Sequence, residues 1–190
     1  MTRTLSEFHR EGMTFEVVDR GAAEHGTVVL LHGFPQTATC WEQVSPLLNA
    51  SGLRTLAPNQ RGYSPQARPR RRTAYRTGQL VDDVVALIDQ AGDGPVHLVG
   101  HDWGAAVAWG VAAGYPDRVR TLTAVSVGHP AAFLQSMVRS DQLKRSWYMG
   151  AFQLPFLPEL LLSDPERVKA GLAATGMTAD GIREVQRGVI

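Results

Sequence analysis

Short apolar runs alternate along the chain with longer segments whose apolar residues recur at helical spacing. The runs predict strands over residues 13–19, 27–31 and 120–127, with shorter strands beginning near residues 53 and 95. Residues 27–31 are continuously apolar and rich in β-branched side chains, which is typical of a strand buried on both faces. Residues 13–19 instead alternate between apolar and polar side chains, as an edge strand would.

The segments between these runs predict helices over residues 39–50, 77–91 and 104–113. Because strands alternate with helices, we expect an α/β fold with a mostly parallel sheet and helices on both of its faces. Active sites in such sheets lie at the carboxyl ends of the strands, so we expect the catalytic residues in the loops that follow the strands.

The pattern changes near residue 129. Residues 131–190 contain no strand-like run and predict several short helices instead. We therefore expect an α/β core over residues 1–128 and a helical segment over residues 129–190. With 190 residues and 44% hydrophobic content, the chain can bury a sizeable core as one domain with an inserted or appended lid.

The stretch Gly100-His101-Asp102-Trp103-Gly104 lies between a predicted strand and a predicted helix. A strand, a sharp Gly-x-Asp-x-Gly turn and a helix are the context of a nucleophile elbow, which lifts its central side chain above the sheet. The glycines at 100 and 104 let the strand and the helix approach closely. Asp102 is therefore the candidate nucleophile.

An aspartate at the centre of the elbow narrows the chemistry. An aspartate of ordinary pKa is ionised at neutral pH, whereas a serine must first lose its proton to a base. Carboxylate attack on an acyl group gives an anhydride, a poor intermediate, but attack on a saturated carbon gives an ester that water can hydrolyse. Asp102 thus suggests an epoxide or an alkyl halide as substrate. A simpler interpretation is that it only caps the helix that follows.

The predicted strand over residues 27–31 ends in His32-Gly33-Phe34-Pro35. A glycine and a proline directly after a buried strand form a tight loop whose backbone N–H groups can point into a pocket. We interpret His32 as an orienting or core histidine rather than a proton-transfer residue.

Four segments occur in an order that resembles a known fold. HGFPQTATCW, APNQRGYSP, AYRTGQLVDDVVALID and VGHDWGAAVAWGVAAGYPDRV look like the α/β-hydrolase fold and, more narrowly, resemble its epoxide hydrolase branch. The resemblance covers nearly the whole chain. It implies Asp102 as nucleophile and an oxyanion hole formed by the N–H groups of Phe34 and Trp103. The resemblance gives a structural rather than a catalytic role to the remaining motif residues, which are His32, Gly33, Pro35, Gly100 and Gly104.

The resemblance also gives the helical segment a role. In the family, a helical cap at this place closes over the sheet and supplies the substrate pocket. Residues 146–153 (SWYMGAFQ) resemble the cap segment that carries one of two epoxide-binding tyrosines, and Tyr148 falls on that tyrosine. The alternative is that Tyr148 is an amphipathic aromatic residue half buried between cap and sheet.

Phe34 and Tyr148 together favour an epoxide over a halide. An opening epoxide develops charge on oxygen and needs a proton donor such as a tyrosine hydroxyl. Dehalogenases of this fold commonly place Asn after the His-Gly of the loop, where this chain has Phe34, which lacks a side-chain donor. One departure from the family pattern is Asn59, where Asp is usual before x-Arg-Gly, and we interpret this position as structural.

Length limits the predicted mechanism. Family members continue after the cap with further strands that bring the charge-relay acid and the histidine that activates water, so the resemblance implies an incomplete sheet. None of the six histidines matches the late catalytic position: His9, His25, His32, His97, His101 and His129. We therefore expect the second half-reaction to be disabled in this chain. The alternatives are a haloalkane or haloacid dehalogenase-like hydrolase and a catalytically inactive ligand-binding or interaction protein.

Composition excludes several other classes. A net charge of +1 implies no polyanionic partner, and the basic run over residues 68–72 is a solvated loop without interleaved aromatic residues, so no nucleic acid is expected. The single Cys40 is compatible with the cytosol, and the N-terminus lacks an apolar signal region. No segment resembles a membrane span, and no metal-ligand spacing or phosphate loop implies a cofactor.

Two partners are expected. The first is a small, apolar, epoxide-like substrate, as the resemblance implies. The second is another copy of the chain, because an apolar strand over residues 120–127 would be prone to pairing if it formed the edge of the sheet.

Overall fold

The computed structural model describes residues 4–139, 164–174, 177 and 179–188. The chain divides into two compact units, Met1–Val127 and Gly128–Ile190. The first unit holds the sheet and the helices that cover it. In the second unit the described helices are α4 (Pro130–Arg139), α8 (Pro165–Ala174) and α9 (Ala179–Gly188). The function of this unit as a cap stays a prediction.

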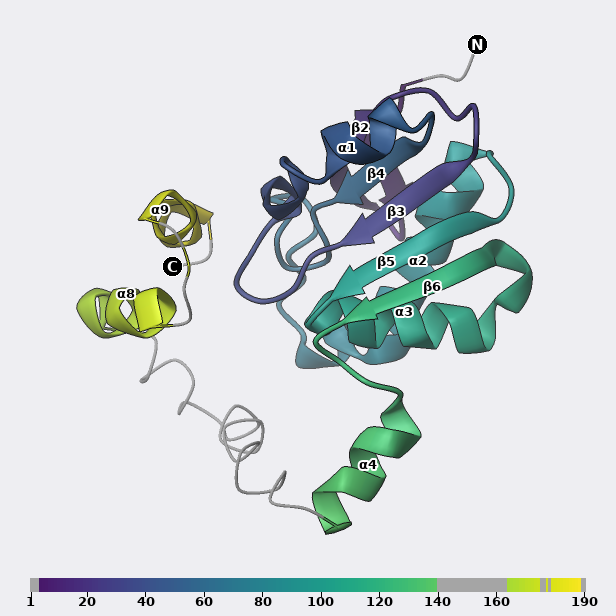
Figure 1. Ribbon diagram of the computed structural model, residues 1–190. Helices are drawn as coiled ribbons and strands as arrows, with labels where there is room; N and C mark the ends of the chain where they lie inside the picture. The colour runs from purple at the N-terminus through teal and green to yellow at the C-terminus, as the bar shows by residue number, and fades with distance from the viewer. Residues whose placement is uncertain (1–3, 140–163, 175–176, 178, 189–190) are drawn as a thin grey trace. The chain divides into compact units, whose positions relative to one another are not determined.

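A six-stranded sheet forms the centre of the first unit, in the order β1-β2-β4-β3-β5-β6 (Figure 1). The strands are β1 (Glu7–Arg10), β2 (Met13–Arg20), β3 (Thr27–Leu31), β4 (Arg54–Pro58), β5 (Val96–His101) and β6 (Val119–Val125). The four strands β4, β3, β5 and β6 pair in parallel, whereas β2 pairs antiparallel with β4 on one side and with β1 on the other. The expected mostly parallel sheet is confirmed.

Helices cover both faces of the sheet (Figure 1). The α-helices of this unit are α1 (Ser45–Ala50), α2 (Thr77–Ala91) and α3 (Trp103–Gly114), with short 3-10 helices at Ala38–Trp41, Arg72–Tyr75 and Pro116–Arg118. The single helix predicted over residues 39–50 is wrong, because the segment splits into a 3-10 turn and α1. Pro46 lacks an N–H and is tolerated only in the first turn, so the α-helix starts immediately before it.

The predicted edge position of β2 is also wrong, because β1 pairs along its outer side. A two-residue turn joins the two strands, with φ of 52° at Glu11 and 74° at Gly12, as a tight hairpin requires. The stacked rings of Phe8 and Phe15, with centroids 4.6 Å apart, fix the hairpin against the core. The pattern missed β1 because Phe8 is the one apolar residue in that strand.

All five residues of β3 are buried, and the four apolar residues 28–31 alternate between two hydrophobic clusters. Val29 and Leu31 belong to the larger cluster, which includes apolar residues of α2 and α3. Val28 and Leu30 belong to the smaller cluster on the other face, together with Ala38. Burial on both faces explains the continuous apolar run, and it fixes β3 in the middle of the sheet.

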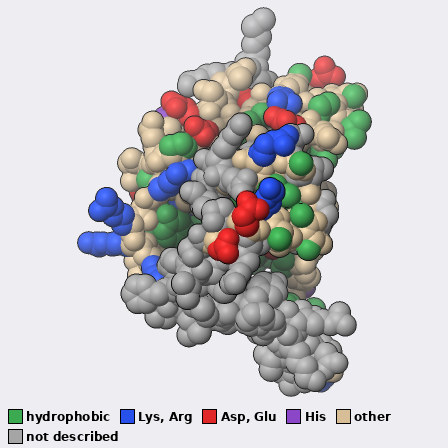
Figure 2. All heavy atoms as spheres, turned by 90° about the vertical axis from the view of Figure 1, so that its left-hand side faces the viewer, with side chains coloured by type: hydrophobic (Ala, Val, Ile, Leu, Met, Phe, Trp, Pro, Cys, Tyr) green, Lys and Arg blue, Asp and Glu red, His purple; other side chains and the backbone are tan. Residues whose placement is uncertain are grey.

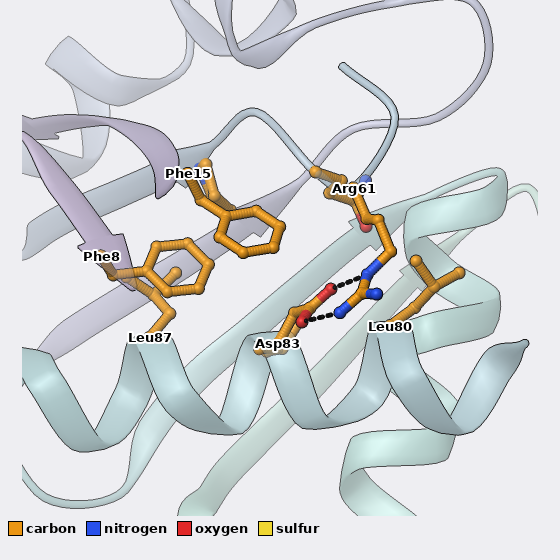
Figure 3. Close-up of a pocket in the computed structure, with 9 residues that line it drawn as sticks. Phe8, Phe15, Arg61, Leu80, Asp83 and Leu87 are labelled. Atoms are coloured by element: carbon orange, nitrogen blue, oxygen red, sulfur yellow. Dashed lines mark hydrogen bonds and ion pairs between the residues drawn. The ribbon is translucent and has the colours of Figure 1, made fainter. Parts of the chain in front are cut away.

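A buried ion pair fastens the loop after β4 to α2 beside a small hollow lined by the hairpin (Figure 3). Arg61 donates through Nε and Nη2 to the two carboxylate oxygens of Asp83, at 2.7 Å each. A third N–H donates to the Ala74 carbonyl at 3.1 Å, and Arg10 binds the same carboxylate at 3.0 Å. The loop that follows β4 is thereby held in place next to the site described below.

The surface of the molecule mixes charge and apolar groups. Seen from the side toward which β3 and β5 point in Figure 1, hydrophobic, acidic and basic side chains are interspersed over the visible described surface (Figure 2). The arginines of the predicted basic loop are exposed: Arg68, Arg70, Arg71 and Arg72. None of the helices in the described part of the chain has the length and apolar character that crossing a membrane requires.

Candidate active site

The sheet changes direction between β3 and β5. From β3 the chain moves to β4 on one side, and it then returns past β3 to β5 on the other side. Such a switch point leaves a crevice at the carboxyl ends of the two strands, because the loops that leave them diverge. The loops that follow β3 and β5 carry the two motifs singled out in the sequence, so the fold brings these motifs together.

Asp102 occupies a sharp turn between β5 and α3. Its φ of 51° and ψ of −120° are rarely adopted by residues other than glycine. The two flanking glycines make this turn possible, because a Cβ on Gly104 would lie 2.6 Å from the His32 carbonyl oxygen and one on Gly100 would lie 2.7 Å from the Ala105 Cα. The predicted elbow context of strand, turn and helix is present.

The carboxylate of Asp102 does not cap the helix that follows. Asp102 stands at the N-cap position of α3, but its side chain makes no capping hydrogen bond. Instead the Phe34 N–H donates a hydrogen bond to Asp102 Oδ1, at 2.9 Å between nitrogen and oxygen. The main-chain carbonyl of Asp102 accepts from Ala105 N–H at 2.9 Å, which starts the helix. The side chain is therefore directed at the loop after β3 and away from the helix end.

Close contact between the two loops explains Gly33. A Cβ at this position would lie 2.5 Å from the Asp102 Cβ, 2.7 Å from Oδ1 and 2.9 Å from the His101 carbonyl oxygen. Only glycine lets the loop approach the carboxylate closely enough for the Phe34 N–H to reach it. Pro35 follows Phe34 through a cis peptide bond.

Two large apolar side chains flank the carboxylate. Phe34 exposes 41% and Trp103 55% of its surface, which is unusual for such residues. Trp103 is the first residue of α3, so its N–H has no acceptor within the helix. An ionised oxygen beside the Asp102 carboxylate would thus meet two candidate backbone donors and an apolar wall.

His32 is completely buried, and backbone groups use both of its ring nitrogens. Nδ1 donates to the Gly33 carbonyl at 3.1 Å, and Nε2 accepts from the Gln60 N–H at 3.1 Å. Burial lowers the pKa of His32 to about 4, so the ring is neutral at physiological pH. This neutral tautomer joins the loops that follow β3 and β4.

The sequence alone did not identify Tyr63 as a residue of the candidate site. Its ring packs edge-on against the His32 ring, with centroids 4.5 Å apart at 79°. Burial and, secondly, the negative charge of Asp102 raise the pKa of the Tyr63 hydroxyl, so it stays protonated. The signal was present in the Arg-Gly-Tyr run after β4, but only the tertiary fold brings this loop near the elbow.

Tyr148 lies outside the described residues, so its predicted role stays a prediction. Among the residues that the structure describes, no group of three His, Cys, Asp or Glu side chains could hold a metal ion.

Comparison with known proteins identifies relatives over most of the chain. Residues 26–174 match the family model of the alpha/beta hydrolase fold. The AB hydrolase superfamily protein YfhM of Bacillus subtilis (strain 168) is 38% identical over 155 residues, covering 80% of this chain and 54% of that protein. Epoxide hydrolase A of Mycobacterium tuberculosis (strain ATCC 25618 / H37Rv) is 37% identical over 163 residues, covering 82% of this chain and 50% of that protein.

A solved structure extends the similarity to the fold. A mutant of an epoxide hydrolase from Bacillus megaterium, in complex with its diol product, matches with a TM-score of 0.83 at 27% identity. The match covers 97% of this chain and 68% of that one. The chain spans about half the length of the curated relatives it matches.

Proposed function

Because the chain belongs to the α/β-hydrolase fold family, with relatives in its epoxide hydrolase branch, we propose that it opens small apolar epoxides through an ester on Asp102. The observation that carries the proposal is the Asp102 carboxylate on a strained elbow, held by the Phe34 N–H at 2.9 Å. An ionised carboxylate in this position is a nucleophile that needs no activating base.

The first half-reaction forms one bond and breaks one. A carboxylate oxygen of Asp102 attacks a ring carbon of the epoxide, and the bond from that carbon to the ring oxygen breaks with its electron pair going to oxygen. The alkoxide takes a proton, which we assign to the Tyr148 hydroxyl. The product is a 2-hydroxyalkyl ester of Asp102, and water would then release a 1,2-diol.

The loop after β3 supports an epoxide rather than an alkyl halide. A departing halide is stabilised by N–H donors, and the Phe34 side chain offers none. The exposed rings of Phe34 and Trp103 instead provide an apolar surface beside the nucleophile, which suits an uncharged substrate. The diol named with the Bacillus megaterium structure is the product expected from this chemistry.

We propose further that the ester persists in this chain, because His32, His97 and His129 make other contacts. His32 is buried and neutral, with both ring nitrogens bonded to backbone groups. His97 Nδ1 lies 2.8 Å from Thr121 Oγ1, and His129 Nδ1 accepts from Ala131 N–H. Hydrolysis of the ester needs an activated water. His32 cannot supply it, because both of its ring nitrogens are bonded, and His97 lies near the amino end of β5, at the other end of the strand from Asp102.

Mass spectrometry tests the first half-reaction. The chain is incubated with styrene oxide, digested, and searched for a peptide whose Asp102 carries the mass of one epoxide. Asp102→Asn should show no adduct, while the matched surface variant Asp89→Asn should react like the parent chain. A folded parent chain that never forms the adduct would refute the proposal and favour the inactive, ligand-binding alternative.

The same incubation tests the choice of substrate and the persistence of the ester. An adduct with 1-bromo-2-phenylethane that forms faster than the styrene oxide adduct would favour the dehalogenase alternative. Diol formation that requires Asp102, above the rate seen with Asp102→Asn, would overturn the proposed persistence of the ester while leaving the Asp102 chemistry intact.

A further inference from the structure

We propose that Asn59 and Gln60 are positioning residues that fasten the loop of residues 33–37 at both of its ends. The inference rests on the proposed function, in which the Phe34 N–H of this loop must meet the Asp102 carboxylate. Both residues follow β4 directly, at the carboxyl end of the strand next to β3. They therefore approach the loop from the side opposite the elbow.

Gln60 holds the first end of the loop through His32. Its backbone N–H donates to His32 Nε2 at 3.1 Å, and its side-chain Nε2 donates to the His32 carbonyl oxygen at 2.5 Å. Two hydrogen bonds from one residue to both the ring and the main chain of another fix its position and its orientation. His32 immediately precedes Gly33, so the start of the loop has little freedom to turn.

Asn59 holds the second end of the loop. Its Oδ1 accepts from the Ala38 N–H at 2.9 Å, directly after the last residue of the loop. Between the two anchored ends, the Gln36 N–H donates to the Gly33 carbonyl at 3.0 Å and closes a tight turn. Phe34 lies inside this turn, so its N–H direction is set by the two ends and the turn together.

The amide of Asn59 also explains why this chain departs from the aspartate of the family pattern. Asn59 Nδ2 donates to Glu16 Oε2 at 2.9 Å, while Oδ1 is committed to Ala38. An aspartate could accept from Ala38 N–H but would bring a second carboxylate against Glu16. Ser64 ties the same two segments together, since its hydroxyl donates to the Asn59 carbonyl and accepts from the Glu16 N–H. The Asn59 amide and the Glu16 carboxylate are therefore complementary as hydrogen-bond donor and acceptor.

The test compares three variants of the full chain. Asn59→Asp keeps an oxygen that accepts from the Ala38 N–H but places its carboxylate against that of Glu16. In the double variant Asn59→Asp with Glu16→Gln, the amide at position 16 donates and the carboxylate at position 59 accepts, so the hydrogen bond is restored in the reverse direction. Asn49→Ala is the matched control. Asn49 also fastens a loop, by donating to the Arg20 and Leu53 carbonyls, but it does so beside the opposite end of β4.

Two readouts separate positioning from general destabilisation. The first is amide hydrogen exchange of Phe34 by NMR, and the second is the rate of Asp102 alkylation by styrene oxide, both compared with the urea midpoint of unfolding. Asn59→Asp should speed Phe34 exchange and slow alkylation by up to about fivefold, because the contact with Glu16 is exposed and solvent screens the repulsion. The double variant should return both rates to the parent values, as expected for directly coupled residues.

The outcomes are distinct. Equal losses in Asn59→Asp and Asn49→Ala at equal stability, or no recovery in the double variant, would overturn the inference. Should Asn59→Asp fail to fold, Gln60→Ala removes only the side-chain bond to His32 and must show the same two effects. A parent chain that never alkylates would refute the proposed function, while the Phe34 exchange rates would still support or overturn the positioning role.

Discussion

Acidification should weaken the fold through His32, which is buried between the loops that follow β3 and β4. The folded state keeps the ring neutral, because burial lowers its pKa from 6.5 to about 4. The unfolded chain takes up a proton at the ordinary pKa. Between these two values the unfolded state therefore binds more protons than the folded state, and stability falls as the pH falls. Well above pH 6.5 the neutral ring makes its full contribution to the free energy of unfolding, and well below about pH 4 no further stability is lost through His32.

The magnitude follows from the two pKa values. At 1.36 kcal/mol for each tenfold change in proton concentration, the loss attributable to His32 is about 2 kcal/mol at pH 5 and about 3 kcal/mol at pH 4. Burial of the ring is the cause, because the charged form loses its hydration there. Protonation would also displace the hydrogen bond from the Gln60 N–H, because a protonated Nε2 can no longer accept it. A loss of this size is a large fraction of a typical domain's stability.

Urea denaturation at about pH 7.5 and about pH 5 measures the effect. His32→Gln is the comparison, because its side-chain oxygen can accept from Gln60 but cannot titrate. Carboxylates common to both proteins cancel in the difference, so the stability advantage of the parent chain over His32→Gln should shrink by about 2 kcal/mol on acidification. An advantage that stays constant between the two pH values would refute the buried, neutral histidine.

Four further predictions follow from the geometry. Gly33→Ala should abolish alkylation of Asp102, because its Cβ would lie 2.5 Å from the Asp102 Cβ, whereas Gly78→Ala, with nothing within 4 Å, should leave the alkylation rate unchanged. Asp83→Asn should cost about 3 kcal/mol in urea unfolding, because the buried Arg61 loses the carboxylate that neutralises its charge. Asp89→Asn loses only an exposed pair with Arg118 and should cost less than about 1 kcal/mol. Tyr148→Phe should slow epoxide opening by roughly 10²–10⁴-fold in single-turnover kinetics and leave any alkyl-halide reaction unchanged. Equal losses of rate on both substrates would mean that Tyr148 shapes the pocket instead of donating a proton. Pairing through β6 should give dimers or larger species by light scattering, and a monodisperse monomer would exclude it.

The amino-acid sequence determined the class of fold because burial leaves a direct pattern. The continuous apolar run Thr27–Leu31 predicted an inner strand, as observed, and the 15-residue helix α2 has the bounds predicted for residues 77–91. Two local predictions failed, the single helix over residues 39–50 and the edge position of the strand over residues 13–19. Pro46 divided the helix expected over residues 39–50, and Phe8 alone could not reveal β1 in a polar segment.

The sequence by itself also predicted the residues to which we assign the chemistry, because the glycines around Asp102 and at position 33 are local backbone requirements. Only the tertiary structure decided what these residues contact. Asp102 stands at the start of a helix, and its sequence neighbours fit a cap equally well, but the Phe34 N–H, 68 positions away, binds its carboxylate. The placements of Tyr63 beside His32 and of Asn59 against Glu16 likewise depend on which strands the sheet makes neighbours. Strand order is a property of the whole chain, because it is set by how the helices and sheet faces bury their apolar surfaces together.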